Sequence, residues 1–104
     1  MYVSESELRR GIKVYKRGNY EEALRILGPL AEADVLEAQR VLSRMYFAGQ
    51  GVDPEREKYL YWLARAGDNG DPAARSKLKR SHKDGELSDY LLRQPSVRRV
   101  LRLP

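Results

Sequence analysis

The sequence offers few side chains whose type and spacing could support catalysis. The chain has one histidine, His82, and no cysteine, which excludes thiol nucleophiles, thiolate metal sites and disulfides. We interpret His82 as a wall residue, half packed against the terminal helix, rather than as a base or ligand. The Gly49-Gln50-Gly51 stretch follows a helical pattern and not a strand, unlike a phosphate-binding loop. We therefore predict a non-enzymatic protein with no catalytic residue, no cofactor and no metal site.

Lysine and arginine side chains offer a different chemistry, the binding of an anionic partner, and their positions repeat along the chain. An offset of 36 residues maps Ala38 to Ala74 and Leu42 to Leu78, and an offset of 31 maps Tyr15 to Tyr46. Arg40, Arg44 and Phe47 lie on the outward face of one predicted helix. The two offsets map these three residues onto two other predicted helices, which gives nine equivalent positions, and seven of the nine are basic. The predicted partner-binding residues are Arg9, Lys13, Lys16, Arg40, Ser43, Arg44, Phe47, Arg80 and Lys83.

The charge distribution supports a basic face. The formal net charge is +5, and residues 71–104 carry nine basic against four acidic side chains, whereas residues 1–70 are balanced. Cations on neighbouring rigid helices suit an acidic protein or peptide, with Phe47 as an apolar anchor. The alternative is RNA or single-stranded nucleic acid, whose phosphates could follow the same basic row. We expect charge reversal at Arg40 and Arg44 to abolish binding without unfolding the chain.

The predicted binding residues lie on helices. Apolar residues recur at helical spacing almost throughout the chain, and no strand alternation is sustained. The pattern predicts helices over 4–17, 20–33, 35–48, 54–69 and 72–84, with shorter ones near Leu87–Leu91 and from Pro95. Asp53 and Asp71 are predicted N-caps, and Pro54 and Pro72 predicted first helical residues. The Gly28-Pro29 pair predicts a kink or an early end in the second helix.

Residues on the inward faces form the predicted core. A truncation of Trp62, the only tryptophan, is expected to be especially costly. The predicted core and turn residues are Tyr15, Leu24, Ala38, Leu42, Tyr46, Gly49, Gly51, Leu60, Trp62, Ala74 and Leu78.

The stretch from Leu36 to Val52, followed by Lys58, Leu60, Trp62 and Ala66 and closed by Gly70, resembles a Sel-one-like repeat (SLR). The stretch from Gly18 to Leu24 is similar to the related tetratricopeptide repeat. The resemblance covers about residues 8–85 and implies an all-α, right-handed α/α superhelical solenoid of about two and a half repeats. It also implies an adaptor or scaffold whose first helices in each pair line the concave side. The chain departs from the family at Ser43, where a helix-packing glycine is usual, and at Tyr59, where a small residue is usual.

The repeat units divide one predicted domain, residues 1–104. They are a first helix pair (4–33), a central pair (35–69), a third-repeat helix (71–85) and a C-terminal cap (86–104). The alternative for the tail is that Val97–Leu103 docks on another protein, a second copy or an anionic membrane surface. No apolar run approaches the ~20 residues of a membrane span, and the first residues lack the pattern of a signal peptide. We therefore expect a cytoplasmic protein.

Overall fold

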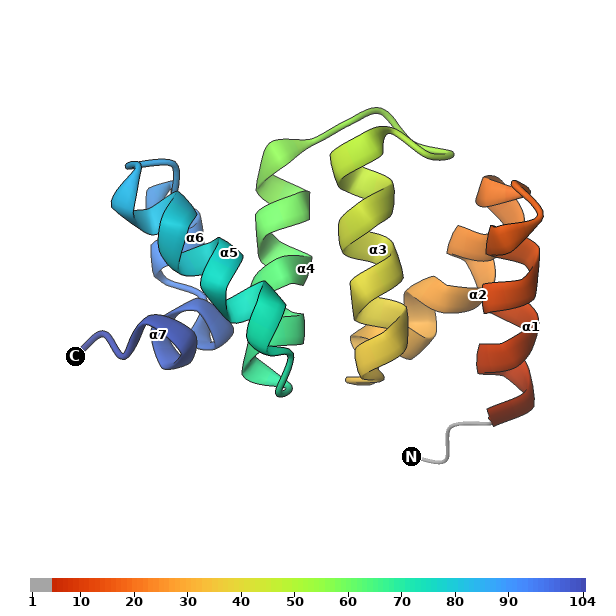
Figure 1. The fold of residues 1–104 in the computed structure, drawn as a ribbon, viewed down its shortest axis with the longest axis horizontal. Coiled ribbons are helices and arrows are strands. Elements are labelled where there is room, and N and C mark those ends of the chain that lie inside the picture. Colours follow the sequence, from red (N-terminus) through yellow and green to blue (C-terminus); the bar gives the residue numbers. More distant parts are fainter. Residues whose placement is uncertain (1–4) are drawn as a thin grey trace.

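The computed structural model describes residues 5–104, and all regular structure within them is helical. Each of the first four helices packs on the next in chain order, and the last helix folds back onto the fourth (Figure 1). The all-α prediction is confirmed for this range, whereas residue 4, the predicted start of the first helix, lies outside it. The helices are α1 (Glu5–Lys16), α2 (Tyr20–Glu32), α3 (Leu36–Ala48), α4 (Arg56–Asp68), α5 (Pro72–Lys83), α6 (Asp89–Leu92) and α7 (Pro95–Leu101).

One turn geometry ends α1 to α5. A residue with positive φ follows each helix, and a backbone N–H next to it donates to a carbonyl five residues earlier, which satisfies the final turn. The positive-φ residues are Gly18, Asp34, Gly49, Gly70 and Gly85. The five hydrogen bonds run from the N–H of Asn19 to the carbonyl of Val14, and likewise from Val35 to Leu30, from Gln50 to Met45, from Asp71 to Ala66 and from Glu86 to Ser81. The repeat offsets of 36 and 31 therefore also relate the turns.

The start of α4 differs from its prediction. The helix begins at Arg56 after an extended Glu55, so Asp53 is not its N-cap and Pro54 is not its first residue. The Glu55 N–H donates to the Tyr46 carbonyl over 3.0 Å, which closes the loop one residue beyond the proline. The Pro54 ring instead packs on the turn at Gly49, where a Cβ would lie only 2.7 Å from it. The matching prediction for α5 is confirmed, since Asp71 Oδ1 accepts from the Ala73 N–H over 3.0 Å and Pro72 opens the helix.

The proline in α2 does not end the helix. Pro29 lies inside it, and regular helix continues to Glu32. The ribbon of α2 changes direction along its length (Figure 1), as expected where a proline ring displaces the preceding turn. The predicted early end is therefore wrong and the predicted bend is present.

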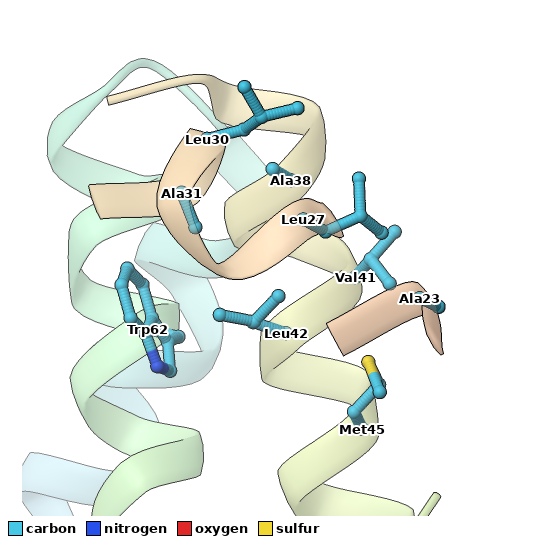
Figure 2. Close-up of a cluster of buried hydrophobic side chains, with 9 residues drawn as sticks. All are labelled: Ala23, Leu27, Leu30, Ala31, Ala38, Val41, Leu42, Met45 and Trp62. Atoms are coloured by element: carbon cyan, nitrogen blue, oxygen red, sulfur yellow. The ribbon is translucent and has the colours of Figure 1, made fainter. Parts of the chain in front are cut away.

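Two apolar clusters form the core and meet at α4. The first joins α2 and α3 to Trp62, which lies beside Ala31 and Leu42 (Figure 2). The second joins α4 and α5 to the tail. Predicted core residues found buried are Ala38, Leu42, Leu60, Trp62, Ala74 and Leu78, while Tyr15, Leu24, Tyr46 and Gly49 are partly buried and Gly51 is exposed.

Polar contacts also fix the turn between α2 and α3 against α4. Asp34 has φ +68°, an unfavourable conformation for a residue with a side chain. Its carboxylate accepts from Arg65 over 3.0 Å and from the buried Gln39 over 3.1 Å, and its carbonyl accepts from Asn69. The hydrogen bond from Arg65 lowers the pKa of Asp34 below its ordinary value. These contacts hold a strained turn in place.

The tail packs on the body of the chain. Leu91, Val97 and Val100 are buried against α4 and α5 together with Leu60 and Leu78. The structure thus places these three tail residues against α4 and α5 of the same chain. The apolar side of α7 is therefore already covered within the chain, and any self-association through the tail would have to use its exposed residues.

Substitution of Gly51 tests the close approach of the α3–α4 loop to α2. Gly51 has φ +74°, and a Cβ there would lie 2.7 Å from Tyr20 Cβ and 3.0 Å from the Tyr20 backbone carbon. We expect Gly51→Ala to lower the free energy of unfolding by about 2–3 kcal/mol, because backbone strain and overpacking add. The control is Gly18→Ala, where φ is +84° but nothing lies within 4 Å. Strain alone should cost about 1 kcal/mol there, and equal losses in urea unfolding would contradict the steric argument.

Candidate functional site

A groove of about 730 Å³ opens between α3, α4 and α5 and reaches Tyr15 of α1. The groove is defined by its lining residues: Tyr15, Arg40, Ser43, Arg44, Phe47, Ala48, Gln50, Arg56, Tyr59, Leu63, Ala66, Asp71, Ala73, Ala74, Lys77, Arg80 and Ser81. The Tyr15 hydroxyl donates to Gln50 Oε1 over 2.7 Å, which ties α1 to the α3–α4 loop at one end. Five lining side chains are cationic and one, Asp71, is anionic.

Three of the five cations have no ionic partner within residues 5–104. Arg44 lies on α3, and Lys77 and Arg80 lie on α5, all with exposed side chains. Neither an ion pair nor a side-chain hydrogen bond engages them in the described part of the chain. Their charges are therefore free to meet an anion in the groove.

An aromatic pair lies in the same groove. The Phe47 and Tyr59 rings are 4.9 Å apart between centroids and tilted by 54°. Phe47 keeps 61% of its surface exposed, and its ring therefore lies open to the groove. Tyr59, the residue that replaces a small one in the resembled family, is the neighbour of Phe47. Burial raises the pKa of the Tyr59 hydroxyl above its ordinary value, so the group stays neutral.

The remaining two cations, although exposed, are paired with carboxylates of the same chain. Arg56 donates to Glu86 over 2.7 Å and its guanidinium lies 5.3 Å from the centre of the Tyr59 ring. The hydrogen bond from Arg56 lowers the pKa of Glu86. Arg40 Nε donates to Asp71 Oδ2 over 3.0 Å and so links α3 to the first turn of α5. Both arginines therefore form part of the groove wall, and their charges are already paired with Glu86 and Asp71.

The structure brings together five of the nine predicted partner-binding residues: Arg40, Ser43, Arg44, Phe47 and Arg80. Arg9, Lys13 and Lys16 are exposed on α1 outside the groove, and Lys83 is exposed at the end of α5, also outside it. The nine residues do not form one continuous lining. Ser43 was expected on the outward face but is 5% exposed, because close packing of α3 against α4 covers so short a side chain.

Sequence reasoning missed several groove residues for identifiable reasons. The offset of 36 places Lys77 at the position of Val41, which is buried, so the repeat pattern did not select it. Arg56 and Tyr59 lie on α4, the second helix of its pair, whereas the resemblance places the first helix of each pair on the concave side. Their spacing with Leu63 and Ala66, at helical intervals, is a signal that could have found them.

His82 is exposed, so its predicted half-packed position is wrong. Among residues 5–104, no cluster of three or more acidic, histidine or cysteine side chains is arranged to hold a metal ion. No helix in this range is both long and apolar enough to cross a bilayer.

Comparison with known proteins adds no assignment. The chain matches no protein-family model, no curated protein and no solved structure. The geometry of the groove is thus the main guide to function.

The Arg40–Asp71 pair predicts a pH dependence of stability. Partial burial would raise the pKa of Asp71, but hydrogen bonds from Arg40 and from the Ala74 and Ala73 amides outweigh it, so the pKa is lowered. A lowered folded-state pKa contributes stability above the unfolded-state value, and this stability is lost as the pH falls through the folded-state value. We expect Asp71→Asn to cost about 1 kcal/mol near neutral pH and almost nothing near pH 2.

Thermal unfolding of the parent and of Asp71→Asn across this pH range checks the prediction. Asp53→Asn is a suitable control, because Asp53 is exposed and forms no ion pair in the described chain. A cost for Asp71→Asn that does not change with pH would show that the charge of Asp71 contributes nothing.

Proposed function

We propose that the chain is a non-enzymatic adaptor that binds an acidic segment of a partner protein in the groove. The observation that carries the proposal is the set of three unpaired cations, Arg44, Lys77 and Arg80, around the exposed Phe47 ring. Carboxylates of a partner would pair with the cations, and an apolar side chain would cover Phe47.

The proposal includes membership of the SLR and tetratricopeptide class and its right-handed α/α superhelical solenoid. The recurrence of one helix-ending turn at the two repeat offsets supports it, because equivalent turns let successive helix pairs stack in the same way. The packing of helices in chain order also supports it.

Charge reversal in the groove tests the proposed function. Arg44→Glu combined with Lys77→Glu replaces two free cations from the two sides of the groove. Arg40 is not used, because a glutamate there would face Asp71 and destabilise α5 as well. We expect the double variant to fold normally and to lose about 100-fold or more in affinity for a labelled acidic peptide that contains one central phenylalanine.

The matched control is Lys79→Glu combined with Arg93→Glu, the same charge change at exposed residues outside the groove. Fluorescence anisotropy measures both variants at moderate salt, and capture from a cell lysate with and without nuclease follows. Equal losses in the two variants would show a non-specific charge effect. Capture that nuclease abolishes would favour nucleic acid over an acidic protein.

A further inference from the structure

A second hollow, of about 410 Å³, lies between α2, α3, α4 and α6. It shares no residue with the basic groove. Its lining residues are Glu32, Tyr46, Glu55, Glu57, Lys58, Tyr61, Trp62 and Tyr90. Four of these side chains are aromatic and three are carboxylates, so the hollow has the opposite charge preference to the groove.

The hollow and the groove lie on opposite sides of α4. The α4 residues of the hollow are at positions 57, 58, 61 and 62, and those of the groove are at positions 56, 59, 63 and 66. At 100° per residue the two sets point in roughly opposite directions. A ligand in the hollow therefore need not compete with a partner in the groove.

The chain's own cations show what the hollow attracts. The Lys58 ammonium lies 5.4 Å from the centre of the Tyr46 ring and 3.6 Å from Glu55 Oε2. Just outside the hollow, the Arg65 guanidinium lies 5.3 Å from the centre of the Trp62 ring and 3.8 Å from Glu32 Oε1. Ring faces and carboxylates attract cations for the same electrostatic reason. Both partners of the Lys58–Glu55 ion pair are about half exposed, so the ammonium is held weakly.

We propose that the hollow is a second binding site, which takes a lysine side chain presented by a partner protein. The incoming ammonium displaces Lys58 from Tyr46 and reaches the carboxylates, and Tyr90, which is 53% exposed, covers its alkyl chain. Lys58 acts as an internal competitor in this arrangement. The site does not depend on the proposed function of the groove.

Two exposed substitutions with opposite expected effects test the site. The probe is a capped tripeptide with a central lysine between glycines, and the matched control peptide carries acetyl-lysine, which is neutral. We expect amide NMR shifts at Tyr46, Tyr61 and Tyr90 with the lysine peptide only. Lys58→Met should tighten binding about 3-fold because the competitor is gone, and Tyr90→Ala should weaken it about 3-fold.

The outcomes separate the site from simpler explanations. Equal shifts with the acetyl-lysine peptide, or unchanged binding in Lys58→Met, would overturn the proposal. Shifts with tetramethylammonium but none with the lysine peptide would also overturn it, because the site would then select a free quaternary cation. If the lysine peptide shifted only the amides of the α3–α5 groove, it would bind outside the hollow, and the proposal would be wrong. Failure of this test leaves the acidic-peptide test of the groove unaffected.

Discussion

Trp62→Ala is expected to lower the free energy of unfolding by about 3–5 kcal/mol. Trp62 is 6% exposed and is the α4 residue in the first apolar cluster, so its removal opens a cavity between α4 and the α2–α3 pair. The variant also loses the edge-on contact with Tyr61, at 5.0 Å between centroids, and the surface on which Arg65 rests. A small domain is stable by only about 5–15 kcal/mol, so the loss is a large part of the whole.

Urea unfolding followed by far-ultraviolet circular dichroism measures this effect, since the variant has no tryptophan fluorescence. Phe47→Ala is the matched control, an aromatic truncation at a residue that is 61% exposed. It should cost less than about 1 kcal/mol. A Trp62→Ala cost no larger than that of Phe47→Ala would contradict the position of Trp62 in the core.

Val97→Asp is expected to cost about 3 kcal/mol or more. Val97 has no exposed surface and packs with Leu63 of α4 and Leu78 of α5 in the second cluster. A carboxylate there would be buried without a partner, so α7 would have to detach and expose that cluster to water. The prediction separates a tail that completes the core from one that waits for another molecule.

Thermal unfolding and proteolysis of the tail measure this effect together. Tyr90→Asp introduces the same group at an exposed position of the same tail and should change stability by less than about 1 kcal/mol. If Val97→Asp unfolds at the same temperature as the parent, α7 does not dock on α4 in solution.

The elements were largely predictable because local chemistry determines them. Glycines at the turns and the Asp71-Pro72 pair mark helix ends within a few residues of the observed positions. The error at α4 arose because Pro54 fits two local roles. It can open a helix, as Pro72 does, or pack on a preceding turn, and the backbone bond from Glu55 to Tyr46 decides between them.

The candidate site was only partly predictable because it depends on contacts between distant residues. The repeat offsets identified Arg44, Phe47 and Arg80, which share one face of equivalent helices. They could not show that Arg40 pairs with Asp71, 31 residues away, or that Lys13 lies beyond the groove. Pairing and groove width are set by how the helices pack, which single-helix periodicity does not encode.

The chain-order packing of the helices has a consequence for the rate of folding. Most helices pack on the next helix in the chain. Their contacts therefore require only short loops to close, and closing a short loop costs little conformational entropy. Folding in about microseconds to milliseconds is the usual range for such local topologies. The return of the tail is the exception, because α6 contacts α4 and α7 contacts both α4 and α5. Docking of the tail is therefore the step with the longest search, and a nascent chain can complete the first cluster before the second.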